Sequence, residues 1–520
     1  MLEFFRNLTK SSLIYGLGSV AAPIVGFFLL PVYTRFLTPS DYGILETLSA
    51  TTSIISIFLI FGMDSSLFRF YFESKVNRDQ RRVLGTTSIF LWALAILVTA
   101  GLAANAGSIS QLLFRQTGLV RVLDVAFLSA AVAAILKIPM LVFRIHNQPV
   151  RYATISLVQT LLTASLCVLF VVGLKAGVLG IMVGTLVAAT VATLAAYYLV
   201  RAEMSYSFSF GLLKSMLRYS SPVLLAGLAL WVSNLSDRYF LLAYSTTTEL
   251  GLYSVGNKFA SAVGLAISAF TLAWPQAAFS VLDQDQETRN RLYSRALTYF
   301  VFAGCSIVLV LSLFGDQLVA LMTTPEFFEG ASVIPILGLG LVFNGCYTIF
   351  ATGMNITKKM GRIFLVTGIP AVLNLALNYL LIPPYGMIGA AWSTLVSYLL
   401  MALLSWQASE RVYHIDYEWG KIGKILAVML LVMAASKFIV IDQIYYSIPT
   451  ELGLLAVYLL ALYFMKIPGR EAYTTMIGLL YALMPAHRGE RGAAVTSSSP
   501  IPDQKPPQIQ GPEANHWQDN

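Results

Sequence analysis

Charged residues are scarce in this sequence of 520 residues. Asp, Glu, Lys and Arg together make up 12% of it, whereas a soluble globular protein carries about 25%. Hydrophobic residues make up 57%, and the mean hydropathy is +0.72. They form runs of about 20 residues, long enough to cross a ~30 Å hydrocarbon layer, and the short alternating segments of a membrane β-barrel are absent. The composition excludes an ordinary soluble protein and predicts an all-α, polytopic membrane protein.

Cysteine and histidine are also rare, and their positions exclude several kinds of site. The three cysteines, all inside apolar runs, are Cys167, Cys305 and Cys346. They lack the spacing of metal ligands, so we expect buried thiols that pack as small apolar side chains, and no disulfide framework. The four histidines, in expected loops or in the tail, are His146, His414, His487 and His516. Because they form neither a triad nor a metal set, we expect a transporter and not an enzyme, with no metal and no other cofactor.

About fourteen apolar runs are predicted to span the membrane. Their approximate bounds are 11–37, 43–70, 84–105, 121–144, 152–173, 178–200, 219–244, 251–275, 296–314, 331–354, 363–382, 387–408, 422–441 and 450–466. Several contain Gly or Pro, as at Ala22-Pro23, which membrane helices tolerate when neighbouring helices satisfy the freed backbone groups. No cleavable signal segment is expected, because the first apolar run is followed by many more.

Basic residues recur at the ends of alternate spans, which is typical of cytoplasmic loops. That side carries Arg6, Lys10, Arg69, Lys75, Arg78, Arg81, Arg82, Arg144, Arg151, Arg201, Lys214, Arg218, Arg289, Arg291, Arg295, Lys358, Lys359, Arg362, Arg411, Lys421, Lys424, Lys466, Arg470, Arg488 and Arg491. The opposite side carries little beyond Arg35, Arg115, Arg121 and Lys175. With an even number of spans, both termini are predicted to be cytoplasmic. The net charge of +8 follows these loops and forms no stripe that would bind nucleic acid.

The two halves of the chain resemble each other. LTKSSLIY at Leu8–Tyr15 matches LLKSMLRY at Leu212–Tyr219, at an offset of 204 residues. At an offset of 209 residues, Gly177, Gly180, Thr185, Leu186 and Val187 recur as Gly386, Gly389, Thr394, Leu395 and Val396. We interpret this as a duplication of about 205 residues and six spans. Because six is even, the repeats are parallel and related by an axis along the membrane normal.

This repeat predicts how the chain is divided. The predicted parts are an N-terminal six-helix bundle (1–205), a C-terminal six-helix bundle (206–410), an added helix pair with an interfacial segment (411–485), and a tail (486–520). The tail is rich in Gly, Ser, Pro and Gln and has too little apolar content to order itself, so it is predicted to be disordered and cytoplasmic.

The stretch Trp231–Phe259 carries Asn234, Asp237, Arg238 and Lys258 within apolar surroundings. A charge in hydrocarbon costs between ~2.5 and more than 10 kcal/mol, so such residues face a bundle interior or a watery cavity. We expect Arg238 and Lys258 to point into one anion-binding pocket, with Asn234 on the same helix face as Arg238. Asp237 should not face its neighbour Arg238, so it is expected to pair with another helix or to carry a proton. The alternatives are a structural ion pair at Arg238 and an outward-reaching Lys258.

Other polar residues in the spans are weaker candidates for substrate binding or gating. Asn374 and Asn378 share a face of the eleventh span and could bind substrate hydroxyls, but hydrogen bonding between helices is the favoured interpretation. Asp64 lies near the inner end of the second span, with Arg69 about one turn beyond it. The two could form a salt-bridged inner gate, although charges at a helix end are slightly favoured.

Arg35 and Glu46 lie at the predicted outer ends of the first two spans. Charges at this depth reach the headgroup region, so both are expected at the interface. Arg35 is in addition a candidate to contact the substrate as it leaves.

Three stretches, in this order, carry a resemblance to a known family. Lys10–Ser49, with its Thr-Arg-Phe-Leu…Asp-Tyr-Gly turn, is similar to the family's first two helices. Asp237-Arg238-Tyr239 followed by Gly251–Ser254 is similar to its seventh and eighth helices, and Pro383–Ala391 to its turn between the eleventh and twelfth. From residue 8 to about 466, the chain resembles the Wzx-type polysaccharide flippases of the multidrug/oligosaccharidyl-lipid/polysaccharide exporter superfamily.

This resemblance implies a V-shaped, MATE-like pair of six-helix bundles that works by alternating access. It implies that an oligosaccharide on a polyprenyl diphosphate moves from the cytoplasmic to the outer leaflet of the bacterial inner membrane, for biosynthesis of a cell-surface polysaccharide such as exopolysaccharide or O-antigen. Polysaccharide polymerase or export machinery would be the protein partners. A proton or sodium ion drives some relatives, but no ion site can be carried over to this sequence.

Three other functions compete with this one. A multidrug cation antiporter of the same superfamily would want a carboxylate in the middle of the first span, and none lies between Lys10 and Arg35. A flippase for the peptidoglycan lipid precursor would be expected to carry a basic residue deep in that span, where the sequence reads Ala21-Ala22-Pro23. A membrane glycosyltransferase or polymerase would need a large outer loop or an acidic motif, and all loops here are short.

Overall fold

The computed structural model describes residues 21–74, 76–204, 207–281, 284–356, 361–439 and 444–467. The beginning of the first predicted span, the segment LTKSSLIY, the interfacial segment and the tail lie outside the described residues. The chain forms two compact units, Met1–Leu462 and Tyr463–Asn520. The description below concerns the first unit. Within it we call residues 21–204 the N half and residues 207–410 the C half.

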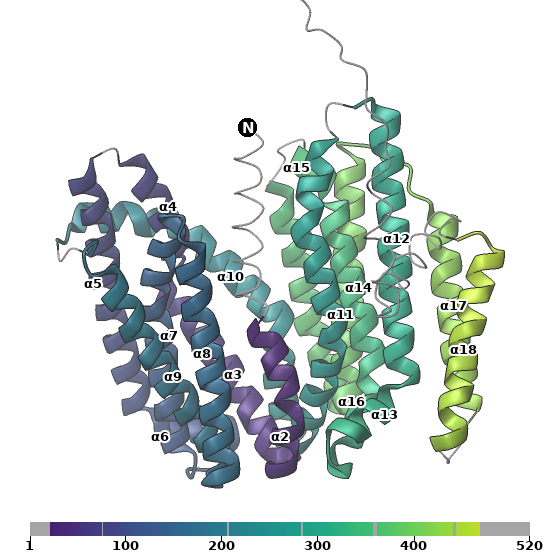
Figure 1. Cartoon of the computed structure of the whole chain (residues 1–520), viewed down its shortest axis with the longest axis horizontal. Coiled ribbons are helices and arrows are strands. Elements are labelled where there is room, and N and C mark those ends of the chain that lie inside the picture. The colour runs from purple at the N-terminus through teal and green to yellow at the C-terminus, as the bar shows by residue number, and fades with distance from the viewer. Residues whose placement is uncertain are drawn as a thin grey trace, which may run out of the picture. The chain divides into compact units, whose positions relative to one another are not determined.

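The described residues form helices and no β-strand, which confirms the predicted all-α class (Figure 1). Residues 21–28 are helical, and the rest of the N half contains α2 (Leu30–Phe36), α3 (Pro39–Ile60), α4 (Met63–Glu73), α5 (Asn77–Ala104), α6 (Ala106–Phe114), α7 (Val120–Ile145), α8 (Pro149–Val168), the π-helix η1 (Leu169–Gly173) and α9 (Gly177–Val200). The C half contains α10 (Phe210–Tyr244), α11 (Thr247–Ser280), α12 (Gln286–Leu313), α13 (Gly315–Met322), the 3-10 helix η2 (Pro325–Val333), α14 (Ile334–Phe350), α15 (Thr352–Ile356) and α16 (Gly361–Glu410). The added pair is α17 (Trp419–Phe438) and α18 (Ile444–Phe464).

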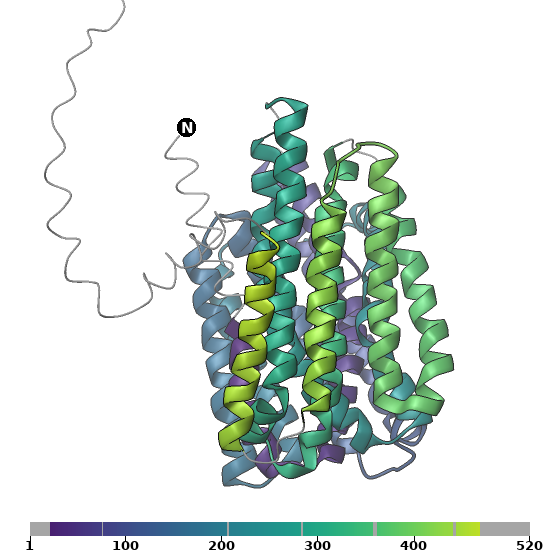
Figure 2. The same ribbon diagram turned by 90° about the vertical axis from the view of Figure 1, so that its right-hand side faces the viewer.

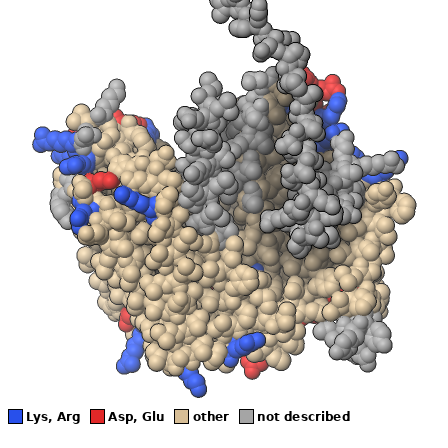
Figure 3. Space-filling view, in the orientation of Figure 1, with Lys and Arg blue, Asp and Glu red and all other residues tan. Residues whose placement is uncertain are grey.

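The outside of the helices is apolar, as a membrane-spanning protein requires. Nine helices in the described part of the chain are long and apolar enough to cross a membrane. Ile96 and Leu97 on α5 are each 70% exposed, and many other large apolar side chains on the outer helices are exposed as well. In Figure 3, most Lys and Arg side chains lie toward the two ends of the molecule, with a largely uncharged band between them. The chain is therefore a multi-pass membrane protein. The arrangement of fourteen spans in two parallel repeats stays a prediction.

Two features differ from the predicted spans. The second span is broken, because Phe61 and Gly62 are both left-handed (φ 53° and 65°) and separate α3 from α4. Gly62 is needed there, since a Cβ would lie 2.9 Å from the carbonyl oxygen of Ser220 on α10. The eleventh and twelfth spans, by contrast, agree with the prediction, because the element α16 consists of two helices joined at a kink at Gly386 (φ 52°, ψ −131°). The short helices α6 and α13 follow the third and the ninth span and were not predicted.

Several local features recur in the two halves at nearly the predicted spacing. Gly177 and Gly386, 209 residues apart, are both left-handed. Thr38 caps α3 by accepting a hydrogen bond from the Asp41 N–H at 3.2 Å. Thr246, 208 residues later, accepts one from the Glu249 N–H at 3.1 Å before α11. These recurrences agree in spacing with the predicted repeat.

The starts of α3 and α11 cross each other without intervening side chains. A Cβ on Gly43 would overlap the carbonyl oxygen of Thr247, and a Cβ on Gly251 would overlap that of Pro39. The contact is reciprocal, because each helix offers a glycine to the first residue of the other helix. Small residues allow membrane helices to pack backbone against backbone. Ser40 and Thr247 add a hydrogen bond of 2.7 Å between their hydroxyls.

Buried side chains fill each half. In the N half, α7 packs on α3, α5 and α9 and is the most buried of the nine candidate spans in the described chain. Cys167, Cys305 and Cys346 are free and buried, as predicted. Figure 2 shows α17 and α18 at the side of the C half. There α17 packs on α12, and the Gln317 Nε2 of α13 donates to Glu451 Oε1 of α18 at 2.6 Å.

Replacing Gly251 by Ala is expected to push α11 away from α3, because the new Cβ cannot fit against the Pro39 carbonyl. Overpacking of this kind costs about 1–3 kcal/mol, so the protein purified in detergent should unfold at a lower temperature. Gly101→Ala in α5 is the matched control, since a Cβ there meets nothing within 4 Å. Equal melting temperatures for the two variants would show that α3 and α11 are not in this close contact.

Candidate functional site

The N half contains the larger polar cavity, with a volume of about 550 Å³. Its walls come from residues 22–33 and from α3, α7, α8 and α9, and α11 of the C half contributes Lys258. Hydroxyl groups dominate the polar part of the lining, which consists of Tyr33, Tyr42, Glu46, Ser49, Thr52, Ser53, Ser56, Ser129, Ser156, Gln159, Thr160, Thr163, Thr185 and Lys258. The cavity therefore presents many polar groups beside an apolar part of its wall, although it lies among membrane-spanning helices.

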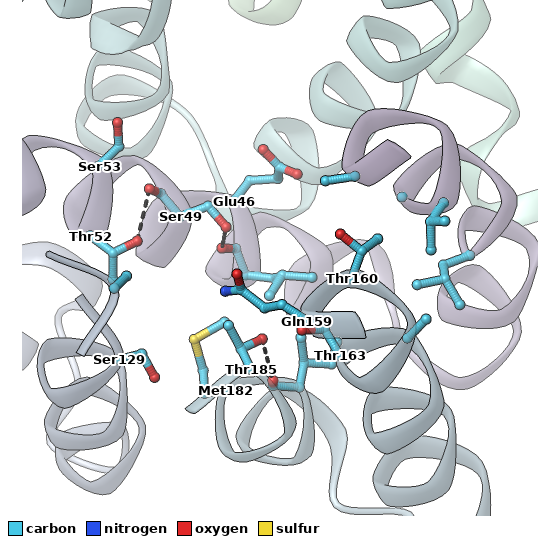
Figure 4. Close-up of a pocket in the computed structure, with 18 of the residues that line it drawn as sticks. Glu46, Ser49, Thr52, Ser53, Ser129, Gln159, Thr160, Thr163, Met182 and Thr185 are labelled. Carbon is cyan, nitrogen blue, oxygen red and sulfur yellow. Dashed lines mark hydrogen bonds between the residues drawn. The ribbon is translucent and has the colours of Figure 1, made fainter. Parts of the chain in front are cut away.

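The spacing of residues on two helices explains why the polar groups gather here. Glu46, Ser49, Ser53 and Ser56 recur every three or four residues and so lie on one face of α3. On α8, Ser156, Gln159, Thr160 and Thr163 lie on one face for the same reason. Figure 4 shows labelled members of both sets around the cavity, with the Gln159 amide of α8 reaching in among the other labelled side chains.

The cavity hydroxyls mainly offer acceptor oxygens. Ser49 Oγ donates to the Leu45 carbonyl at 2.9 Å, and Thr160 Oγ1 donates to the Ser156 carbonyl at 2.9 Å. Ser56, Ser129 and Thr185 do the same within their own helices. Each hydroxyl hydrogen is thereby occupied, while lone pairs on the oxygen remain available. A ligand rich in hydroxyl donors can bind such a wall without breaking the helices' own hydrogen bonds.

A smaller cavity of about 360 Å³ lies in the C half. Its polar lining residues are Ser261, Ser268 and Thr271 of α11 and Asn344, Tyr347 and Thr348 of α14, and Pro23 also borders it. None of the described residues that line it is charged. Ser268 Oγ donates to the Gly264 carbonyl at 2.7 Å, so this wall has the same acceptor character as that of the N half.

Beside the larger cavity, a buried ion cluster joins three helices. Arg238 on α10 is 5% exposed, and its Nη1 donates to Asp237 Oδ1 at 2.8 Å. Its Nε lies 3.9 Å from Glu46 Oε2 on α3. The hydroxyl of Tyr253 on α11 donates to Asp237 Oδ2. An unpaired charged group in hydrocarbon costs free energy, so these groups are stabilised by remaining paired. Their pairing links α3, α10 and α11.

This geometry changes the expected roles of the stretch Trp231–Phe259. Lys258 lines the cavity as predicted, but Arg238 does not, since its guanidinium is held by acids. This matches the alternative of a structural ion pair. Contrary to expectation, Asp237 pairs with its neighbour Arg238, because the Arg238 guanidinium folds back along the helix. Asp237 also bonds to Tyr253 of another helix, as predicted. Asn234 is exposed, and its Oδ1 accepts from the Tyr398 hydroxyl at 2.6 Å.

The two asparagines of α16 are buried and bond to α10. Ser236 Oγ donates to Asn374 Oδ1 at 3.2 Å, and Asn378 Nδ2 donates to the same oxygen at 3.0 Å. Asn374 and Asn378 are 1% and 0% exposed and line neither cavity. This arrangement is the hydrogen bonding between helices that was the favoured interpretation.

The predicted gate pair does not form. Arg69 Nε bonds to Glu73 Oε1 at 2.7 Å, and its guanidinium lies 4.5 Å from the centre of the Tyr219 ring. Asp64 Oδ1 accepts instead from the N–H of Ser65 at 2.9 Å. Asp64 is in the first turn of α4, where a carboxylate is favoured by the exposed N–H groups. Asp64 is therefore a charge at a helix end in this structure, as the alternative had it, whereas Arg69 pairs with Glu73 within α4.

Arg35 and Glu46 have different surroundings, although both were expected at the interface. Arg35 is exposed in the last turn of α2 and lines neither cavity. Glu46 is different from the prediction, because its side chain is only 14% exposed and borders both the cavity and the ion cluster. The reason is that α3 begins at Pro39, before the predicted start of the second span at residue 43, so Glu46 lies about two turns inside the helix and not at its end.

Several polar contacts join the two halves toward the predicted outer end, in addition to those that the N half makes with residues at and near the start of α10. Thr34 Oγ1 donates to the Met322 carbonyl at 3.3 Å, and Thr324 Oγ1 donates to the Thr34 carbonyl at 3.2 Å. Thr51 and Tyr239 share a 2.7 Å hydrogen bond between their hydroxyls. In the C half, Met387 N–H donates to Glu249 Oε1 at 2.7 Å at the bend of α16. The structure is thus closed at this end, on one side of the cavity.

Among the described residues, no group of three or more His, Cys, Asp or Glu side chains is placed to hold a metal ion. His146 makes a different kind of cluster at the ends of α4, α7 and α9. Its Nδ1 lies 2.6 Å from Glu203 Oε2, and its Nε2 lies 2.9 Å from the Tyr71 hydroxyl. These bonds tie three helix ends together, away from both cavities.

Comparison with known proteins gives one family. A family model described as "Polysaccharide biosynthesis protein" matches residues 32–332. The probable low-salt glycan biosynthesis flippase Agl15 of Haloferax volcanii is 23% identical over 44% of this chain and 49% of its own length. The capsular polysaccharide biosynthesis protein CapF of Staphylococcus aureus is 26% identical over 35% of this chain and 44% of its own. The chain spans about half the length of these curated relatives.

Solved structures share the fold. The lipid II flippase MurJ in an inward closed conformation superposes with a TM-score of 0.70 at 14% identity, over 88% of this chain and all of that one. A multidrug resistance MATE family transporter in an inward-facing conformation gives a TM-score of 0.62 at 15% identity, over 76% and 93% of the two chains. At this identity the similarity concerns the fold alone, and it agrees with the MATE-like class predicted from the sequence.

Arg238→Met is expected to destabilise the protein strongly, because it leaves Asp237 and Glu46 without their cation. Breaking a buried ion pair on one side costs about 3–5 kcal/mol. The matched control is Arg121→Met, since Arg121 is exposed at the start of α7 and surface changes cost no more than about 0.5 kcal/mol. Thermal unfolding in detergent measures both. Equal melting temperatures would mean that the cluster contributes nothing to stability.

Proposed function

This chain belongs to the polysaccharide biosynthesis protein family, whose model covers more than half of it, and from this premise we propose that it is a flippase for lipid-linked oligosaccharides. It would carry an oligosaccharide on a polyprenyl diphosphate from one leaflet to the other by alternating access, without breaking a bond. The single observation that carries the proposal is the hydroxyl-lined cavity of about 550 Å³ among membrane-spanning helices.

The chemistry of the cavity fits this cargo. Sugar hydroxyls are donors, and the cavity wall offers the acceptor oxygens of its serines and threonines together with the Gln159 amide. Moving a sugar head and its phosphates through hydrocarbon unaided would leave many polar groups without partners. A hydrophilic cavity with one lysine, Lys258, supplies both hydrogen bonds and a cation. The lipid tail would remain in the bilayer.

A cation exporter of the same superfamily is the second candidate, and Glu46 is the observation that favours it. The first span has no carboxylate, but Glu46 from α3 brings one to the cavity. Its charge is offset by Arg238, whose Nε lies 3.9 Å away. A cavity whose acid is already matched by a buried base attracts cations weakly, so the flippase is the better-supported function. The peptidoglycan lipid precursor is a further cargo that the same experiment can include.

The setting of the protein is proposed from the same premise. The basic loops favour cytoplasmic termini, and the resemblance to Wzx-type flippases implies a bacterial inner membrane. Polysaccharide polymerase or export machinery would receive the product on the outer side. A proton or sodium gradient could drive the cycle.

Reconstitution tests the proposal. The purified protein is placed in vesicles with a polyprenyl-diphosphate oligosaccharide that carries a fluorophore on its sugar, and dithionite added outside quenches only the outer leaflet. With the flippase, quenching should proceed from about half of the fluorescence toward all of it, whereas protein-free vesicles should stop at half. Quenching no faster than in protein-free vesicles would refute the function. Parallel vesicles with ethidium and with the peptidoglycan lipid precursor report the alternative activities.

Lys258→Gln is expected to slow translocation at low substrate concentration by about tenfold or more. The reason is that a hydrogen bond to a charged group contributes about 1.5–3 kcal/mol, and each 1.4 kcal/mol is tenfold in affinity. Lys437→Gln is the matched control, because Lys437 is an exposed lysine on α17 that lines neither cavity. The quenching assay measures both variants, and equal rates would remove Lys258 from the binding site.

A further inference from the structure

Lys137 is a charged side chain in the membrane-spanning part of α7 that has not been assigned a role. It lies within Val120–Ile145, the most buried of the nine candidate spans in the described chain, yet it is exposed. Counting 1.5 Å per residue from Val120, it lies about 25 Å along the helix, short of the predicted cytoplasmic end. An ionisable residue at such a depth is expected to face a watery cavity, because the bilayer penalises a charge.

The helical repeat places Lys137 on the cavity side of α7. Ser129, Ala130 and Ala133 line the larger cavity, and Lys137 follows Ala133 by four residues, which puts the two on one face. Arg144, seven residues further on, continues this face and is also exposed. Lys137 therefore lies one turn beyond the cavity wall, about 6 Å toward the predicted cytoplasmic end.

The charge of Lys137 is not matched by the protein. Among the described residues it has no ion pair within 4 Å and no recorded hydrogen bond. The situation of Arg144 differs, since its guanidinium lies 5.3 Å from the centre of the Phe68 ring. A free ammonium at the mouth of a hydrophilic cavity is suited to an anion that arrives with the ligand. Arg238, by contrast, is neutralised by acids on both sides.

Resting on the proposed function, we propose that Lys137 binds the phosphate-bearing end of the lipid-linked sugar at the mouth of the N-half cavity. The sugars then lie deeper, against the polar faces of α3 and α8, and the lipid tail leaves toward the bilayer. This order follows from the covalent order of the ligand, in which the phosphates lie between sugar and lipid. Lys258 of α11 lines the cavity itself, so it meets the ligand only after the ligand has entered further.

Binding of two soluble probes tests the assignment. Both carry one N-acetylhexosamine on a short prenyl chain, but one has a diphosphate link and the other an uncharged ether link. Protein in phosphatidylcholine vesicles is titrated with each probe. Lys137→Gln should weaken the diphosphate probe by about ten- to a hundredfold, the range for a hydrogen bond to a charged group, and leave the ether probe unchanged. Lys137→Arg should retain most of the affinity, which shows that the charge matters and that the fold survives.

Three outcomes would overturn the inference. Wild-type affinity of Lys137→Gln for the diphosphate probe would show that Lys137 does not bind phosphate. An equal loss for both probes would point to a structural role. If phosphatidylglycerol in the vesicles abolishes the difference in affinity for the diphosphate probe between wild type and Lys137→Gln, Lys137 binds the phosphate of bilayer lipids and not that of the substrate. The proposed function fails separately, when the wild type neither binds the diphosphate probe nor translocates the labelled oligosaccharide.

Discussion

The high cost of an unpaired charge in hydrocarbon is the constraint on which this structure depends. At Arg238 the protein meets it by pairing, since Asp237 and Glu46 surround the guanidinium and Tyr253 holds the acid from the next helix. At Lys137 and Lys258 no such partners are recorded among the described residues, and the side chains lie at or near a hydrophilic cavity instead. The polar residues of the spans are thus of two kinds. Those that are paired hold helices together, and those that lie at or near the cavity remain available to a ligand.

This division explains how a cavity can exist between helices that must also stay together. Many of the polar contacts across the halves lie toward the predicted outer end, around Thr34, Thr51 and the crossing of α3 with α11. The hydroxyl-lined walls lie deeper, where α8 faces α3 (Figure 4). The helix α10 belongs to both regions, because it begins against α4, where Ser66 Oγ donates to the Met216 carbonyl at 2.8 Å, and ends against α16.

Much of the fold could be predicted from the sequence, because each helix is a local property of an apolar run. The break between the eleventh and twelfth spans at Gly386 was also predicted, because Pro and Gly mark it in the sequence. The break at Gly62 was missed, since its position is set by a close contact with Ser220, which lies far away in the chain. The short helices α6 and α13 were missed because the prediction considered only runs long enough to cross the bilayer.

The site was predicted less well, and the reason is physical. A charge signals that a partner or water is near, but the sequence does not say which, so Arg238 and Lys258 looked alike. The serines and threonines of α3 and α8 were overlooked, although Glu46, Ser49, Ser53 and Ser56 follow a helical period that indicates one polar face. Lys137 was missed because the basic residues were counted at the ends of spans and not within them.

The crossing of α3 and α11 has a consequence for how this protein can change over evolution. A side chain at Gly43 would overlap the backbone of α11, and one at Gly251 would overlap the backbone of α3, so neither position can enlarge on its own. An insertion in either turn would shift one glycine along its helix and bring a bulkier residue into the junction. The cavity walls of the two halves can therefore change independently, whereas a substitution at this junction in one half is constrained by the backbone of the other half.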